Sequence, residues 1–194
     1  IDCEGSTITI DAIASQRSIT EKIIEKKADY LIGLKSNQGS LFEQVSDWLR
    51  SRKTTLPSFI EIDKDHGRGE IRSTYVCEDL HFLEETYEWS GLRSIVMTEC
   101  RRIVDGKETT SERFYISSLS GTKPEQYAKL VRDHWSIENN LHWHLDVTFR
   151  EDQSSVWKKN EPANLSIVRK FALFLLSKEE SKISLKRKRK KAAR

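Results

Sequence analysis

The first 35 residues constrain the fold most, because they read as a strand, a helix and a second strand. The stretch "STITIDA" (6–12) alternates β-branched residues and carries Asp11 at its end, which is typical of a short buried strand. Isoleucines then recur at helical spacing within 15–28, and "YLIGLK" (30–35) predicts a second buried strand. Since two strands joined through a helix form the right-handed crossover of a sheet, we expect an α/β fold.

The rest of the chain adds helices and hairpins to this core. Residues 37–52 place their apolar side chains on one helical face, which predicts a second covering helix. The segments 58–78 and 93–119 each read as two alternating runs around a glycine-containing turn, so we expect two β-hairpins. Helices should begin near Pro124 and Pro162, because proline suits a first helical turn.

Bulk properties narrow the class of protein. A chain of 194 residues can bury one good core without a second independent domain. Its three cysteines are widely spaced, which argues against a disulfide framework and a zinc ribbon and indicates a reduced, cytosolic setting. The longest apolar run, 171–176, is too short to span a bilayer. We expect a soluble, intracellular protein.

The C-terminus concentrates positive charge. The formal net charge is only +3, but "SLKRKRKKA" (184–192) is almost wholly basic. Like charges repel and cannot pack, so we expect 181–194 to be a disordered or fraying arm suited to phosphate contacts.

The segment "HWSIENNLHWHLD" (134–146) allows three interpretations. In a helix, Glu138, His142 and Asp146 recur at i, i+4 and i+8 and share a stripe. That stripe is a solvated polar face, a zinc site that also draws on His134 and His144, or a hard-cation site that combines Glu138 with carboxylates of the sheet. The zinc interpretation lacks the H-E-x-x-H spacing and any thiolate. The hard-cation interpretation suits Mg²⁺, which prefers oxygen ligands.

Asp11 is the candidate partner of Glu138. It follows the first predicted strand, at the sheet edge where α/β proteins bind ligands. Its alternative role is to cap the following helix, although we expect that helix to begin only near Ser15. Lys35, Asn37 and Gln38, just past the second strand, add donors to the same edge and are candidate phosphate contacts, or simply a polar loop.

Several motifs together resemble one known family, the H-repeat-associated DDE transposases of bacterial insertion sequences. The chain is similar to about the C-terminal two-thirds of these proteins. The resemblance covers nearly the whole chain in order, in these stretches: "TITIDAIASQ", "DYLIGLKSNQGSLFEQV", "DHGRGEIRS", "ERFYISSL", "HWSIENNLHWHLDVTFREDQS", "NEPANLSIVRKFALFLL" and "SLKRKRKKA".

The resemblance implies a partial RNase H-like α/β fold over 1–180: a strand–helix–strand core plus C-terminal helices, with a β-hairpin insertion at about 57–120. It also implies a DNA transposase that joins strands by two-metal phosphoryl transfer. Asp11 matches the second catalytic acidic residue and Glu138 the third, both as ligands of Mg²⁺, for which Mn²⁺ can substitute. The implied partner is double-stranded DNA, at element ends and target, in the bacterial cytoplasm at the nucleoid. No membrane partner is implied, and a homodimer is left open for the full-length protein.

Two departures from the family pattern matter. The first catalytic Asp would lie upstream of Ile1, so we expect 1–194 to be a truncated enzyme that is inactive alone; the alternative is a non-catalytic DNA-binding remnant of a decayed mobile element. The Tyr, Arg and Lys that flank the Glu in related transposases fall here on Val131, His134 and Leu145. Phosphate contacts must then come from other residues.

The candidate DNA-contacting residues, besides those at the sheet edge, are Arg68, Arg132, His134, His142, Lys186, Arg187, Lys188 and Arg189. Trp143 and Trp157 could stack on an unpaired base, but we expect both to be partly buried against neighbouring helices.

Overall fold

The predicted strand–helix–strand unit is present and sets the start of the sheet. It consists of β1 (Thr7–Ile10), α1 (Arg17–Glu25) and β2 (Asp29–Leu34), and β1 pairs with β2 in parallel. The computed structural model describes residues 2–65, 68–84 and 88–193. The chain divides into two compact units, residues 1–132 and 133–194.

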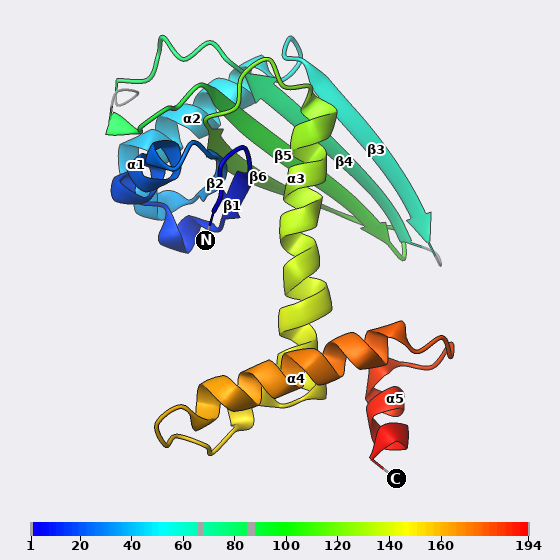
Figure 1. Ribbon diagram of the computed structural model, residues 1–194. Helices are drawn as coiled ribbons and strands as arrows, with labels where there is room; N and C mark the ends of the chain where they lie inside the picture. The colour runs from blue at the N-terminus through cyan, green and yellow to red at the C-terminus, as the bar shows by residue number, and fades with distance from the viewer. Residues whose placement is uncertain (1, 66–67, 85–87, 194) are drawn as a thin grey trace. The chain divides into compact units, whose positions relative to one another are not determined.

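Both predicted hairpins form, and their strands extend the same sheet. They are β3 (Ser58–Asp65) with β4 (Arg68–Cys77), and β5 (Ser94–Val104) with β6 (Lys107–Ser117). The sheet order is β1-β2-β6-β5-β4-β3, and every pair except β1 with β2 is antiparallel (Figure 1). The fold is therefore mixed α/β with one open six-stranded sheet, consistent with a partial RNase H-like fold.

Helices cover both faces of this sheet in the first unit. Alternation along β2 sends Tyr30 and Ile32 into a core shared with α1 and α2 (Gly39–Arg52), whereas Leu31 enters a second core on the other face. In that second core Tyr127 of α3 (Pro124–Ile137) is fully buried, and its hydroxyl lies 2.8 Å from Ser94 Oγ. Strands buried on both faces explain why β2 reads as a continuous apolar run.

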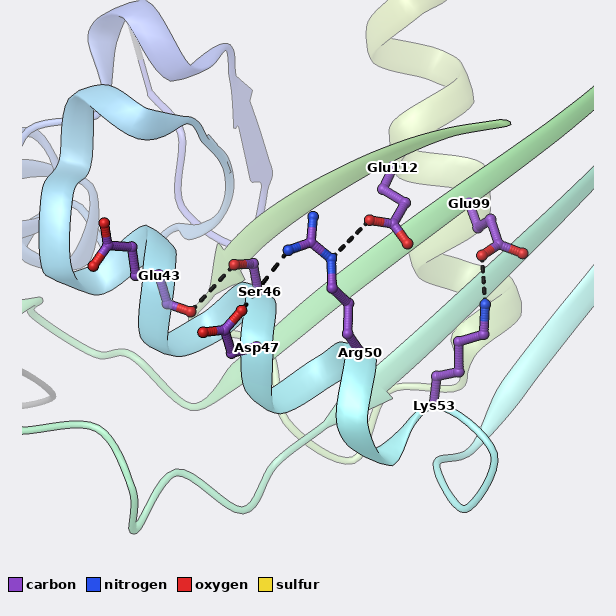
Figure 2. Close-up of polar contacts among 7 residues, drawn as sticks. All are labelled: Glu43, Ser46, Asp47, Arg50, Lys53, Glu99 and Glu112. Atoms are coloured by element: carbon purple, nitrogen blue, oxygen red, sulfur yellow. Dashed lines mark hydrogen bonds and ion pairs between the residues drawn. The ribbon is translucent and has the colours of Figure 1, made fainter. Parts of the chain in front are cut away.

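Charged side chains fasten α2 to the sheet beyond its apolar contacts. Arg50 Nε donates to Glu112 Oε2 at 2.9 Å, and Lys53 Nζ to Glu99 Oε2 at 2.6 Å (Figure 2). The hydrogen bond to Glu99 is the main cause that raises the pKa of Lys53. The Glu99 side chain is only 10% exposed, so its carboxylate depends on that ammonium group for compensation.

The second unit is helical and has a shallow core. The last residues of α3 lead into two π-helical stretches, Glu138–His142 and His144–Thr148, followed by α4 (Glu161–Lys178) and α5 (Leu185–Ala192). Leu145 and Leu173 are its buried apolar residues in the described part of the chain. Several large side chains of α4 remain more than half exposed: Ile167, Val168, Phe171, Phe174 and Leu175.

The basic C-terminus differs from the expected disordered arm, because residues 185–192 form the helix α5. Lysine and arginine are good helix formers, and two anchors offset their mutual repulsion. Lys188 Nζ lies 3.3 Å from Glu179 Oε2, and Arg189 donates to the Thr148 carbonyl while its guanidinium lies 4.9 Å from the centre of the Phe149 ring. The sequence pattern alone did not reveal these partners.

Two further expectations concern cysteines and membranes. Within the described part of the chain, none of Cys3, Cys77 and Cys100 forms a disulfide. No helix in the described ranges is long and apolar enough to cross a membrane.

Candidate functional site

Asp11 lies directly after β1 with its carboxylate accessible. It precedes a 3₁₀ turn, Ala12–Ala14, and its side chain makes no capping hydrogen bond within the described structure. The following helix, α1, begins at Arg17, close to the expected position. The Asp11 side chain is 43% exposed, and Lys35 Nζ lies 3.5 Å from its Oδ1. The capping role proposed as an alternative therefore does not occupy this carboxylate.

The loop after β2 holds the Asp11 turn in place. Asn37 Nδ2 and Gln38 Nε2 both donate to the Ala12 carbonyl, at 3.2 and 3.1 Å, and Gln38 Oε1 accepts from the Lys35 amide at 2.9 Å. The structure thus brings Asp11, Lys35, Asn37 and Gln38 together at one sheet edge. The two amide groups that we predicted as phosphate contacts serve here to join the two loops.

Gly33 of β2 makes this close approach possible. A Cβ atom at this position would lie 3.2 Å from the Ala12 backbone nitrogen, which is tighter than ordinary van der Waals contact. The missing side chain therefore allows the turn that follows Asp11 to rest against β2.

Glu138 lies where α3 gives way to π-helix. Its carbonyl accepts the Trp143 N–H, and the His144 carbonyl accepts the Phe149 N–H at 3.0 Å, both bonds of the i→i+5 type. We predicted a helix here but did not anticipate the wider turn. π-Helical turns are rare and frequent at functional sites.

The predicted polar stripe exists at its first step. His142 Nδ1 lies 3.3 Å from Glu138 Oε1, with the two side chains 51% and 49% exposed. Partial desolvation is the main cause that raises the pKa of Asp146, the nearby Asp152 carboxylate raises it further, and His142 partly offsets both. The stripe is thus half-exposed and holds carboxylates on both sides of one imidazole.

A zinc site on this helix finds no support. His144 Nδ1 lies 3.2 Å from Thr148 Oγ1, and the His134 ring packs edge-on against Trp135 at 5.7 Å. Across the described ranges, no group of three or more His, Cys, Asp or Glu side chains is arranged to hold a metal ion. Asp11 belongs to the first unit and Glu138 to the second.

The other predicted DNA contacts fall into three groups. Arg132 is paired with Glu61, with 2.8 Å between Nη1 and Oε1. Arg68 begins β4, but its side chain lies outside the described structure. The four basic residues predicted at 186–189 lie on α5, where Lys188 and Arg189 make the contacts described above.

Sequence reasoning missed some exposed groups. Trp157 is 82% exposed and Trp143 52%, so the expected burial of Trp157 is wrong and that of Trp143 is limited. Arg150 was not singled out, yet it lines a hollow of the second unit together with Lys190 of the basic C-terminus. Since 40 residues of sequence separate them, no local pattern could have linked the two.

The fold and the positions of Asp11 and Glu138 define the class of protein: an α/β domain with an acidic residue at the end of its first strand and another on a later helix. The chain matches the family described as "Transposase DDE domain" over residues 1–175. It belongs to the DDE transposase family.

Three curated relatives match the whole chain. They are "Putative protein YbfL" and "H repeat-associated putative transposase YhhI" of Escherichia coli K12, at 36% and 35% identity, and "Putative transposase YncI" of Escherichia coli O157:H7, at 38%. The chain covers 53%, 53% and 51% of their respective lengths. It therefore spans about half the length of these relatives, less than the two-thirds expected from the motifs.

Proposed function

We propose that this chain supplies Asp11 and Glu138 to the catalytic centre of a transposase that cuts and joins double-stranded DNA. The observation that carries the proposal is the position of Asp11: an accessible carboxylate directly after β1, held by the loop of the next strand. The family match over residues 1–175 gives this carboxylate its chemical context.

The donor chemistry fits a hard divalent cation. Asp11 and Glu138 offer carboxylate oxygens, and both side chains are between 40% and 50% exposed, so water can complete the coordination of Mg²⁺ or Mn²⁺. Such ions, when bound, activate the attacking oxygen and stabilise the leaving oxygen of a phosphodiester.

The protein groups around the two acids position them. Asn37 and Gln38 restrain the backbone after Asp11, and Lys35 Nζ, 3.5 Å away, partly neutralises the carboxylate. The Lys35 side chain is 65% exposed, so its ammonium group is also accessible to a phosphate bound beside Asp11. His142 lies one turn further along the helix and orients the Glu138 carboxylate, with 3.3 Å between Nδ1 and Oε1.

Two acids of the DDE set match this sequence, and we propose that the third lies on a strand paired with β1. β1 is one of the two edge strands of the described sheet, and all four of its residues are only partly buried, whereas strands of parallel sheets are normally covered on both sides. By this proposal the 194-residue chain alone does not cleave DNA. The full-length enzyme acts on element ends and target DNA in the bacterial cytoplasm, and can do so as a homodimer.

The test compares 1–194 with a version extended upstream through the third acid. Both are incubated with Mg²⁺ or Mn²⁺ and DNA that carries the element ends, and strand cleavage and joining are measured. We expect activity only in the extended protein, lost in Asp11→Asn and Glu138→Gln but kept in Asp133→Asn, which removes an equal charge from an exposed helix position. Cleavage by 1–194, or full activity of either catalytic variant, would contradict the proposal.

A further inference from the structure

The second unit contains a basic hollow of about 340 Å³. Its walls come from the end of the second π-helical stretch, the residue that follows Phe149, and α5. The lining residues are Val147, Thr148, Arg150, Lys186, Arg189, Lys190 and Ala193. Four of these seven side chains are cationic and none is acidic.

The hollow is built by specific contacts rather than by a loose arm. Arg189 bonds to the Thr148 carbonyl and covers the Phe149 ring, and Lys188 bonds to Glu179 at the other side of α5. Arg150 adopts a left-handed backbone conformation, with φ of 56°. That conformation is uncommon for a residue other than glycine and marks a constrained turn.

We propose that this hollow binds one phosphate group of a nucleic-acid strand, with Arg150, Lys186 and Lys190 as the direct contacts and Arg189 as the group that positions α5. Three cationic donors that surround one space suit the oxygens of a phosphodiester. The choice of nucleic acid as the source of the phosphate rests on the proposed function.

The proposal divides the basic segment into two kinds of residue. Lys186 and Lys190 line the hollow, whereas Arg187 does not, and Lys188 is paired with Glu179. A diffuse cationic arm would make no such distinction, because every charge along it would contribute about equally. By this proposal Arg187, which the sequence suggested as a DNA contact, does not touch the bound phosphate, because it lies outside the lining. It therefore provides a control that is matched in charge and lies on the same helix.

The experiment measures binding of the 194-residue chain to a fluorescent oligonucleotide, single- or double-stranded, over a range of salt concentrations. The variants are Arg150→Gln, Lys190→Gln and Arg187→Gln. We expect each of the first two to weaken binding about three- to tenfold and to lower the salt slope by about 1. Arg187→Gln should change affinity less than twofold. Equal losses in all three variants would overturn the pocket in favour of a diffuse arm.

A second measurement separates this proposal from the transposase assignment. Inorganic phosphate is titrated into the same chain at constant ionic strength, and the backbone amide signals of Thr148 and Arg150 are followed by NMR. Saturable shifts that Lys190→Gln abolishes would support the hollow even if the wild-type chain bound no oligonucleotide, in which case the DNA function would fail alone. Oligonucleotide binding without phosphate-induced shifts, and without loss in Lys190→Gln, would overturn the hollow and leave the DNA function standing.

Discussion

The side-chain amide of Gln38 donates a hydrogen bond to the Ala12 carbonyl, with 3.1 Å between nitrogen and oxygen. Asn37 donates to the same carbonyl at 3.2 Å. Because Ala12 follows Asp11 directly, these two bonds couple the loop after β2 to the candidate catalytic carboxylate. Polar residues that read as ligand contacts in the sequence thus act on the backbone beside the acid.

Removal of this link should loosen the Asp11 turn. We expect Gln38→Ala to lower the free energy of unfolding by about 1–2 kcal/mol, since the bond to the Ala12 carbonyl and the bond from the Lys35 amide are both lost while Asn37 keeps the carbonyl satisfied. The double variant Asn37→Ala/Gln38→Ala should cost more than the sum of the single changes, because it leaves the carbonyl without either donor. Urea unfolding measures both, and Gln126→Ala, at an exposed position of α3, is the control. A strictly additive pair would contradict the shared-acceptor geometry.

Gly33 should resist even the smallest enlargement. A methyl group there would come within 3.2 Å of the Ala12 nitrogen, so we expect Gly33→Ala to destabilise the protein by about 1–2 kcal/mol through overpacking. Gly69→Ala is the matched control, because among the described residues its Cβ would meet Ile103 Cβ alone, at 4.0 Å. That control should be neutral or slightly stabilising. Equal thermal unfolding midpoints for the two variants would argue against the tight contact.

The pair between Lys53 and Glu99 should matter more than an exposed ion pair. Lys53→Met leaves a carboxylate that is 10% exposed without its partner. We expect a loss of about 1–2 kcal/mol at neutral pH, below the full cost of a buried pair because Lys53 is 35% exposed. Glu99→Gln in the same background should restore part of it. Arg101→Met, which breaks the half-exposed pair with Glu108, should change stability by less than about 0.5 kcal/mol.

The same pair gives stability a pH dependence at the alkaline end. The pKa of Lys53 is raised in the folded state, mainly by its hydrogen bond to Glu99. Its contribution is therefore complete below the ordinary lysine pKa and is lost as the pH rises through the raised value. Urea unfolding of wild type and Lys53→Met at increasing pH should show their difference shrinking above about pH 10.4. A difference that grows with pH would reverse the sign and refute the assignment.

Asp146 predicts a pH dependence at the acid end. Desolvation and Asp152 raise its folded-state pKa, so its contribution to stability is greatest below the unfolded pKa and falls as the pH rises through the raised value. Asp146→Asn should therefore stabilise the protein at neutral pH and make no difference in strong acid. Asp133→Asn is the control of equal charge. An NMR titration of the Asp146 carboxyl group tests the pKa directly, and a midpoint at or below the usual aspartate range would contradict it.

The sequence predicted those elements whose side-chain periodicity is compatible with only one type of secondary structure. The alternating run of β1, the buried run of β2, the apolar face of α2 and the turn at Asp105–Lys107 each identify a local structure, and the structure confirms these elements, although β1 is only partly buried. The gathering of Asp11 with Lys35 also followed from topology, because the carboxyl ends of adjacent parallel strands meet at one edge.

What the sequence could not predict depends on partners distant along the chain or on small local energy differences. The pairing of Arg132 with Glu61 spans 71 residues. The folding of α5 depends on Thr148 and Glu179, which a local charge pattern does not reveal. The π-helical turns keep a helical pattern of apolar residues, so periodicity could not separate i→i+4 from i→i+5 hydrogen bonding.

The π-helical turns after Glu138 also affect how relatives should be aligned. An i→i+5 hydrogen bond encloses one more residue than the i→i+4 bond of an α-helix. Each such turn therefore contains one extra residue, while the spacing of the apolar side chains still looks helical. Relatives that lack the wide turns would show an apparent deletion there. A basic residue found by counting a fixed number of positions after the glutamate would then not be the residue that occupies the same place in space. Leu145, which occupies that count here, is buried. To find the residue that corresponds to the basic side chain of related transposases, an alignment should therefore allow a gap between residues 138 and 148.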